Sequence, residues 1–215
     1  MKRRVNPSPR ASSATAALRK RDRRMQEVLK AASDVFAEKG FFGATTRDIA
    51  ERLEMLPGSL YYYISSKEDA LLKVCEQTGR RYVRMMQELL RDPAPVTELV
   101  ARGILSHIQG NRIDLVYSFA LGTRELPPAL RNNLSKLSRR YQKQWEQLLE
   151  RGVQSGEFRA GLDCRLAAVG VLALCNGAVG WYEKRPAREI ESIARSFSSL
   201  LLSGMTRHAG RDRLR

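Results

Sequence analysis

Apolar residues recur along most of the chain three or four positions apart, the spacing of one face of an amphipathic helix. The first such stripe begins after Lys20 and is followed by Gly40, a residue type that commonly ends helices. It consists of Met25, Val28, Leu29, Ala32, Val35 and Phe36. The pattern predicts a first helix that packs one face against a core.

Two short helices are predicted directly after the first one. Thr45 or Thr46 can cap the first of them, because a threonine hydroxyl accepts a hydrogen bond from the exposed backbone of a helix start. Pro57 suits the first turn of the next helix, which we expect to run to about Tyr63. Two short helices separated by a tight break indicate a helix-turn-helix between Thr45 and Tyr63.

The rest of the chain also has helical spacing, interrupted by loops that contain proline or glycine. No alternating pattern of useful length predicts a strand. The predicted boundaries are Ser66 and Asp92 for the fourth helix, about 96–109 for the fifth, about 111–121 for the sixth, Pro127 for the start of the seventh, Asp163 for the cap of the eighth and Pro186 for the start of the ninth. The sequence therefore predicts an all-α protein of about nine helices.

The excess of positive charge indicates a polyanionic partner. The formal net charge is +15, and residues 1–24 contain nine Lys and Arg residues against one aspartate. A basic arm ahead of a more balanced body is typical of proteins that follow phosphates. We expect residues 1–19 to form a flexible basic arm, which could also enter a minor groove. A solubilising tail is the alternative.

Several classes of protein are excluded by what the chain lacks. Its three cysteines form no CxxC pair, and its two histidines, His107 and His208, do not combine with a nucleophile or with metal-ligand spacing. The apolar run Leu166–Cys175 is about half the length of a membrane span, and the N-terminus has no apolar signal segment. We therefore expect a cytoplasmic protein without metal, cofactor, membrane association or enzymatic activity.

Residues 25–72 resemble the DNA-binding head of the TetR-type transcriptional repressors. The matching residues are Phe36, Gly40, Phe41, Thr45, Thr46, Ile49, Ala50, Gly58, Ser59, Leu60, Tyr61, Tyr62, Tyr63, Lys67, Glu68 and Leu71. Two departures lie in and after the turn. Glu54 and Leu56 stand where the family often has a glycine and a serine, and Tyr63-Ile64 replaces a frequent His-Phe pair.

The resemblance implies which residues contact DNA. They lie at the start of the second helix, in the third helix and at the start of the fourth: Thr46, Arg47, Gly58, Ser59, Tyr61, Tyr62, Tyr63 and Lys67. A tyrosine hydroxyl can bind phosphate, and Arg47 can pair with guanine or bind a phosphate. Leu60 and Ile64 are expected to face the core. Packing of all three tyrosines in a core is the alternative interpretation.

The same resemblance implies a homodimer. In the family the eighth and ninth helices, here residues 163–205, form a four-helix bundle across a two-fold axis. Small residues in the eighth helix suit close approach of a second helix: Ala167, Ala168, Gly170, Ala173, Gly177, Ala178 and Gly180. Burial within a single chain is the alternative. Two copies would read a palindromic operator.

An effector site is implied in the central helices. The candidate ligand-binding residues are Met86, Tyr117, Arg124, Tyr141, Trp145, Asn176 and Trp181. Ordinary core packing is the alternative interpretation of the bulky residues among them, because helical spacing alone explains most of them. Asn176 is informative because a polar amide in an apolar helix needs a partner. Residues 141–158 and Trp181-Tyr182 look similar to TetR-type regulators of lipid or steroid catabolism that sense acyl-coenzyme A thioesters.

Taken together, the chain is expected to be a ligand-responsive repressor of double-stranded operator DNA. Its predicted parts are the arm 1–19, the helix-turn-helix domain 20–66, a ligand-binding and dimerisation domain 67–205 and a basic tail 206–215. A repressor of efflux pumps that senses hydrophobic drugs is an alternative, and a ligand-independent architectural DNA binder is another.

Overall fold

The computed structural model describes residues 9–109, 126–182 and 186–206, with side chains at 19–109, 126–177, 186 and 188–206. The predicted all-α class is confirmed: these residues form eight helices, and the described part of the chain has no strand beyond one isolated bridge between Phe158 and Thr206. The helix expected at 111–121 lies outside the described residues. The chain divides into two compact units, Met1–Val74 and Cys75–Arg215, within helix α4.

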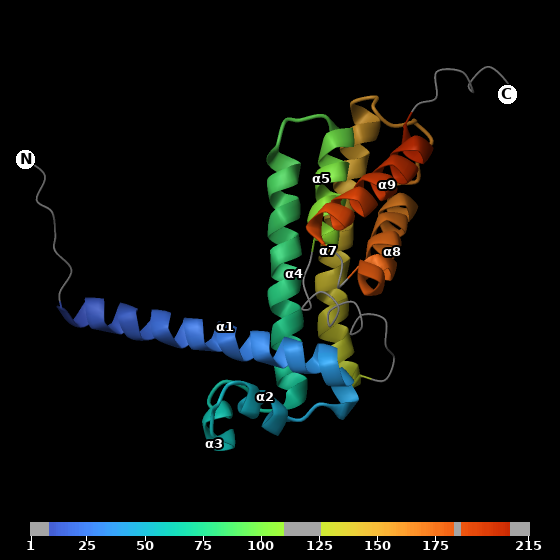
Figure 1. Ribbon diagram of the computed structural model, residues 1–215. Helices are drawn as coiled ribbons and strands as arrows, with labels where there is room; N and C mark the ends of the chain where they lie inside the picture. Colours follow the sequence, from blue (N-terminus) through green and yellow to red (C-terminus); the bar gives the residue numbers. More distant parts are fainter. Residues whose placement is uncertain (1–8, 110–125, 183–185, 207–215) are drawn as a thin grey trace, which may run out of the picture. The chain divides into compact units, whose positions relative to one another are not determined.

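The first unit contains α1 (Pro9–Gly43), α2 (Thr46–Arg52), α3 (Pro57–Leu60) and the start of α4 (Lys67–Arg91) (Figure 1). The predicted stripe of the first helix supplies much of the core of this unit. Its buried apolar residues include Val28, Leu29, Ala32, Val35, Phe36, Ile49, Ala50, Leu60, Ile64 and Leu71. A core of this kind fixes the two short helices against the end of α1.

Helix α1 begins earlier than its apolar stripe predicts. Its first residue is Pro9, so residues 9–19 are helical where we expected a flexible arm. Proline fits the first turn of a helix because its missing N–H would have had no partner there, and the alanines that follow favour helix over coil. At Gly40 the backbone takes φ 68° and ψ 161°, a conformation that favours glycine, and this breaks the helix at the predicted place.

The predicted third helix is shorter than expected. It ends at Leu60, and Tyr61–Tyr63 form a turn instead of a further helical turn. The amide of Tyr63 bonds to the carbonyl of Leu60 at 2.8 Å. The aromatic side chains therefore leave a turn, in which the Tyr62 and Tyr63 rings meet edge to face with centroids 5.2 Å apart.

Capping side chains fix the starts of the helices. The amide of Asp48 donates to the Thr45 hydroxyl at 3.2 Å, and the Asp48 carboxylate accepts from the backbone amide of Thr45 at 2.7 Å, so Thr45 is the cap. The Lys39 ammonium, the Thr45 hydroxyl and the Thr45 backbone amide all donate hydrogen bonds to the Asp48 carboxylate. These bonds lower the pKa of Asp48 to about 2. The predicted cap of Asp163 on the eighth helix is also present, at 2.9 Å from the amide of Leu166.

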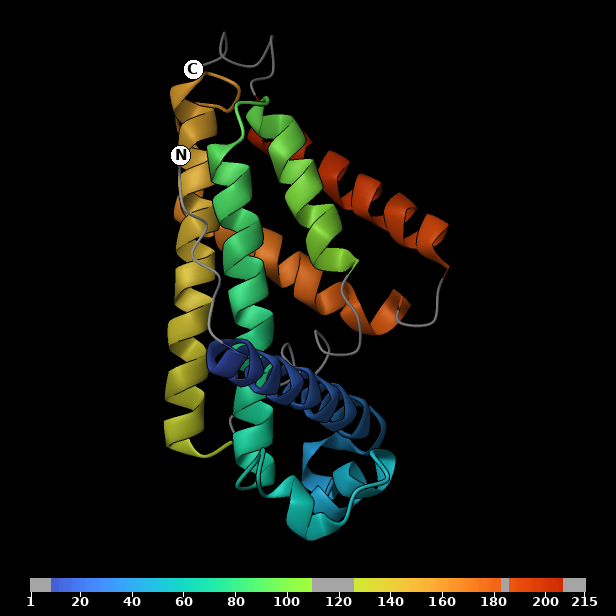
Figure 2. The same cartoon turned by 90° about the vertical axis from the view of Figure 1, so that its left-hand side faces the viewer.

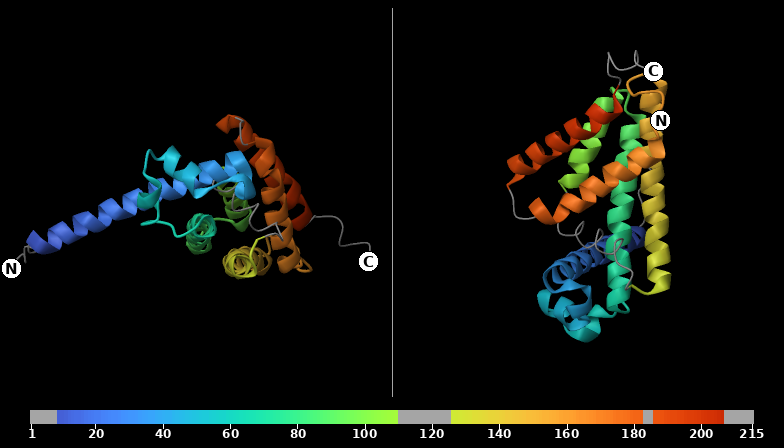
Figure 3. Two further views of the ribbon diagram at one scale, coloured as in Figure 1. Left: turned by 90° about the horizontal axis from the view of Figure 1, so that it is seen from below. Right: turned by 90° about the vertical axis from the view of Figure 1, so that its right-hand side faces the viewer.

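The second unit consists of the rest of α4 with α5 (Val96–Ile108), α7 (Pro128–Gln154), α8 (Cys164–Tyr182) and α9 (Ala187–Met205). In the left view of Figure 3, α4 and α7 are seen end-on beside one another. In Figure 2, α8 crosses this pair obliquely, and α9 runs obliquely beside α5. Helix α5 packs against α7, α8 and α9. The core is apolar, with Met86, Ile104, Tyr141, Trp145 and Leu148 fully or almost fully buried.

Glu157, in the loop after α7, caps α5 from a distant part of the chain. Its carboxylate accepts hydrogen bonds from the amides of Val96 and Thr97, both at 3.0 Å, and from the Thr97 hydroxyl at 3.2 Å. Burial raises the pKa of Glu157, but these hydrogen bonds outweigh it, so the pKa lies below its ordinary value. The ionised carboxylate therefore stabilises the folded chain.

Replacing Glu157 by glutamine should lower the free energy of unfolding at pH 7 by about 1 kcal/mol, the usual contribution of a capping side chain. Because the folded-state pKa is the lower one, the contribution is present above the unfolded-state pKa and disappears as the pH falls through the folded-state value. Urea unfolding of both proteins at pH 7 and below pH 4 measures this. Glu150→Gln on α7 is the control, and an equal difference at both pH values would contradict the assignment.

Candidate DNA-binding and effector sites

The outer side of the helix-turn-helix carries most of the residues expected to contact DNA. Arg47, Gly58 and Ser59 are exposed, whereas Thr46 is half-buried. Tyr61 and Tyr62 are 57% and 67% exposed, and Tyr63 is half-buried. Leu60 and Ile64 are each 1% exposed, as predicted, and they anchor this turn to the core. The structure thus gathers these polar side chains on one small head.

The turn between α2 and α3 explains one departure from the family pattern. Glu54 has a positive φ of 52°, the left-handed conformation that favours glycine. The amide of Met55 still reaches the carbonyl of Ala50 at 2.9 Å, so the turn closes with a glutamate in the left-handed position. The expected position of α3 is therefore kept without the glycine.

Lys67, expected to bind phosphate, is engaged within the head. Its ammonium lies 3.2–3.3 Å from the carbonyl oxygens of Phe41, Phe42 and Ala44, and 4.9 Å from the centre of the Phe41 ring. An ammonium group has three N–H donors, and three carbonyls accept them here. Lys67 therefore joins the start of α4 to the end of α1, where the break at Gly40 turns these carbonyls out of the helix.

A buried polar network crosses the second unit. His107 on α5 is 2% exposed, and its two ring nitrogens lie 3.0 Å from the Tyr141 hydroxyl and 3.0 Å from the Asn176 side-chain oxygen. The Asn176 oxygen can only accept, so Nε2 of His107 donates and Nδ1 accepts from Tyr141. Tyr82 on α4 stacks on both the His107 ring and the Tyr141 ring, with centroids 4.6 and 4.9 Å away. Four helices are joined by these side chains.

The structure brings together some of the predicted ligand-binding residues. Met86, Tyr141 and Trp145 are buried in the same core, and Tyr141 and Trp145 are in edge-on contact. Asn176 was expected to need a hydrogen-bond partner, and His107 is that partner. Tyr117 and Arg124 lie outside the described residues, and so does the side chain of Trp181, whose backbone belongs to α8.

Trp145 has two unusual features. Its indole N–H is buried and has no hydrogen-bond partner within the described part of the chain. Its ring lies against Gly103, where an added Cβ atom would approach the ring to 2.6 Å. The glycine therefore makes room for the indole, and a donor is left in apolar surroundings.

His107 and Tyr82 were not among the predicted ligand-binding residues. His107 occupies a core position of α5, one turn after Gly103 and Ile104, and this spacing was the available signal. Tyr82 lies on the apolar face of α4. Sequence spacing indicates that such residues are buried, but it does not indicate which of them meet.

Apolar side chains remain exposed on α8 and α9. Leu166 and Val169 on α8 are 67% and 43% exposed, and Leu200 on α9 is 66% exposed. Three small residues of α8, Gly170, Ala173 and Gly177, are exposed as well. No helix in the described ranges is long and apolar enough to cross a membrane. The predicted interface helices thus offer an apolar surface that a second helix pair can cover.

Both units match family models. The model for bacterial regulatory proteins of the tetR family matches residues 28–74. The model for the tetracyclin repressor-like C-terminal domain matches residues 95–205. The second match alone spans more than half of the chain, and the first contains the helix-turn-helix.

Full-length relatives are similar over most of this chain. The fatty acid metabolism regulator protein of Bacillus subtilis is 27% identical over 190 residues, which are 86% of this chain and 97% of the relative. The transcriptional repressor KstR2 of Rhodococcus jostii is 29% identical over 191 residues, 85% of this chain and 91% of the relative. Both relatives are named as regulators.

The solved structure of the regulator FadR from Bacillus subtilis in complex with stearoyl-CoA superposes on this chain with a TM-score of 0.71 and 25% identity. The superposition covers 83% of this chain and 98% of that one. The chain therefore belongs to the tetR family of bacterial regulatory proteins, and it is a DNA-binding transcriptional regulator and not an enzyme.

Proposed function

We propose that this regulator is a repressor that binds a palindromic operator as a homodimer and releases it when a long-chain acyl-coenzyme A thioester binds the second unit. The observation that supports the choice of effector is the stearoyl-CoA complex of the Bacillus subtilis relative, whose structure superposes on 83% of this chain and over 98% of its own length. Repression and release follow the mode implied by the family. Such a protein works in the cytoplasm, where operator and acyl-CoA are both present.

The core of the second unit supports an amphipathic effector. Its interior is apolar around Met86, Leu148 and Ile104, which suits an acyl chain. The indole N–H of Trp145 is buried without a partner among the described residues, and it can donate a hydrogen bond to a thioester carbonyl. An apolar lining with a few polar groups is the usual composition of a site for such ligands.

The apolar surface of α8 and α9 supports the dimer. A recognition helix reads only a few base pairs, so two copies on a palindrome are needed for a specific site. Leu166, Val169 and Leu200 would become buried between two copies. We infer that residues 163–205 form the interface.

Addition of stearoyl-CoA should both stabilise the protein and dissociate it from DNA. At a ligand concentration of about 100 times the Kd, binding adds about 2.7 kcal/mol to the free energy of unfolding, which raises the Tm by roughly 5–10 °C for a chain of this size. Differential scanning fluorimetry measures the first effect. Electrophoretic mobility shifts on a duplex selected from a random pool measure the second.

Coenzyme A alone and free stearate are the controls, because each has only one part of the amphipathic ligand. Release by neutral hydrophobic drugs but not by acyl-CoA would replace this proposal with an efflux-type repressor. Binding of DNA that no ligand changes would favour an architectural role.

A further inference from the structure

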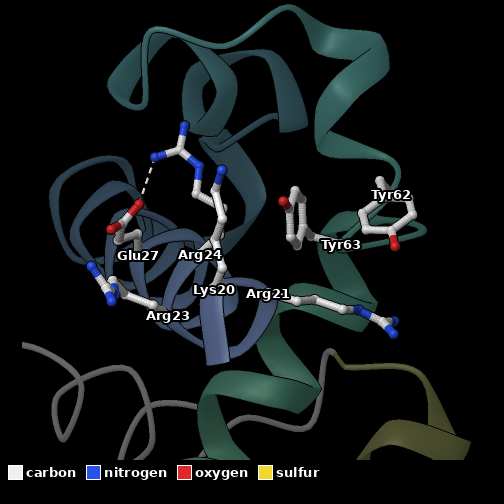
Figure 4. A pocket seen from close by; sticks show the side chains of 7 residues that line it. All are labelled: Lys20, Arg21, Arg23, Arg24, Glu27, Tyr62 and Tyr63. Atoms are coloured by element: carbon white, nitrogen blue, oxygen red, sulfur yellow. Dashed lines mark hydrogen bonds and ion pairs between the residues drawn. The ribbon is translucent and has the colours of Figure 1, made fainter. Parts of the chain in front are cut away.

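A groove of about 580 Å³ lies on the first unit between α1 and the turn that follows α3 (Figure 4). One wall is formed by α1 at Lys20, Arg23 and Arg24, and the other by Tyr62 and Tyr63. Figure 4 shows Tyr63 between the Lys20–Arg24 side of the groove and Tyr62. The groove therefore adjoins the aromatic turn of the helix-turn-helix.

The walls of this groove are strongly basic. Of its cations, Arg24 is paired with Glu27 at 2.5 Å, and the Arg21 guanidinium lies 5.5 Å from the centre of the Tyr62 ring. Lys20 and Arg23 line the groove without an ion-pair partner among the described residues. Figure 4 shows the Lys20 side chain and the Tyr63 hydroxyl facing one another, whereas Arg23 lies further round α1 and Tyr62 lies beyond the Tyr63 ring. A cation and a hydroxyl in this arrangement match the chemistry of a phosphate group, since both donate to its oxygens.

The helical form of residues 9–19 determines whether this segment can enter the minor groove or can only lie against the phosphate backbone. Residues 9–19, directly ahead of the groove, are helical and do not form an extended strand. An α-helix with side chains is about 10–12 Å across, whereas the minor groove is about 6 Å wide. Residues 9–19 in this helical form do not fit inside the minor groove as an extended segment does.

We propose that the groove between Lys20, Arg23 and the Tyr62–Tyr63 turn binds the DNA phosphate backbone beside the site that α3 reads. This proposal rests on the proposed DNA-binding function and deepens it. The contact adds affinity without reading bases, because its groups match phosphate oxygens in any sequence. Arg21 and Glu27 hold the walls in place through Tyr62 and Arg24.

The test compares the full-length Lys20→Ala/Arg23→Ala variant with the wild-type protein on two duplexes. One duplex is selected from a random pool by the wild-type protein, and the other has an unrelated sequence. The slope of log K against log salt should become less steep by about 0.9 for each phosphate contact that is lost. The change should be the same on both duplexes, so the ratio of the two affinities stays constant.

Lys30→Ala/Arg84→Ala is the matched control, because it removes the same charge from two exposed residues that do not line the groove. Its slope should equal that of the wild-type protein. Both double variants alter exposed side chains, so an unchanged Tm checks that they fold.

Two outcomes would overturn the proposal. An unchanged slope in Lys20→Ala/Arg23→Ala means that the groove binds no phosphate, and a changed affinity ratio means that it reads bases. Failure of the DNA-binding function itself has a different signature, since the wild-type protein would then select no preferred duplex from the pool.

Discussion

Replacing Lys67 by methionine should lower the free energy of unfolding of the first unit by about 2–3 kcal/mol, because hydrogen bonds from a charged donor are worth more than neutral ones. The ammonium of Lys67 donates to the carbonyls of Phe41, Phe42 and Ala44, and methionine keeps a similar length without a donor. Three carbonyls at the end of α1 would lose this donor. Chemical denaturation of the full chain measures the loss.

DNA binding by the same variant distinguishes two roles of Lys67, the positioning of α4 against α1 and direct binding of a phosphate. If the lysine positions α4 against α1, the variant binds more weakly as the head loosens, but the salt dependence of binding keeps its slope at temperatures where the head is folded. If it binds a phosphate, the slope becomes less steep by about 0.9. Lys30→Met, at an exposed position of α1, is the control and should leave the free energy of unfolding unchanged within about 0.5 kcal/mol. Equal stability of Lys67→Met and the wild-type protein would contradict the positioning role.

Local signals were sufficient to predict most of the fold. The caps at Thr45 and Asp163, the break at Gly40 and the prolines before α7 and α9 all act within a few residues of the sequence, so they can be recognised without the structure. The early start of α1 is not evident from the charge of residues 1–19, which is typical of a flexible arm, because the helix there depends on alanines that the charge pattern does not reflect. The end of α3 is not evident from the sequence, because Leu60 and Ile64 have the spacing of one helix face and are both buried, although Tyr61–Tyr63 form a turn.

The sites were predicted less completely, because their geometry depends on contacts between distant segments. The exposure of Tyr61 and Tyr62 follows from a local rule, since consecutive residues cannot all face inward. The three carbonyls around Lys67 lie more than 20 positions away in the sequence. Likewise, Asn176 was expected to need a partner, but no local pattern indicates that this partner is His107.

Replacing His107 by leucine should have the largest effect in the second unit. The side chain is similar in size, but buried Tyr141 and half-buried Asn176 each lose a partner at 3.0 Å. Removing one partner from a buried polar group costs about 1–3 kcal/mol, and the stacking contact with Tyr82 is lost as well. We expect a loss of about 3 kcal/mol, which lowers the Tm by roughly 6–12 °C, measured by thermal unfolding.

A double-mutant cycle tests whether His107 acts through the network. Tyr141→Phe removes one hydroxyl and should cost about 1 kcal/mol by itself. Within His107→Leu the same change should cost much less, because the hydroxyl has already lost its bond to His107, so the two losses should not add. Additive losses would mean that His107 stabilises the core by packing alone. Coupling of the two losses would instead show that the hydrogen bond between α5 and α7 is part of what holds the effector-binding unit in one arrangement.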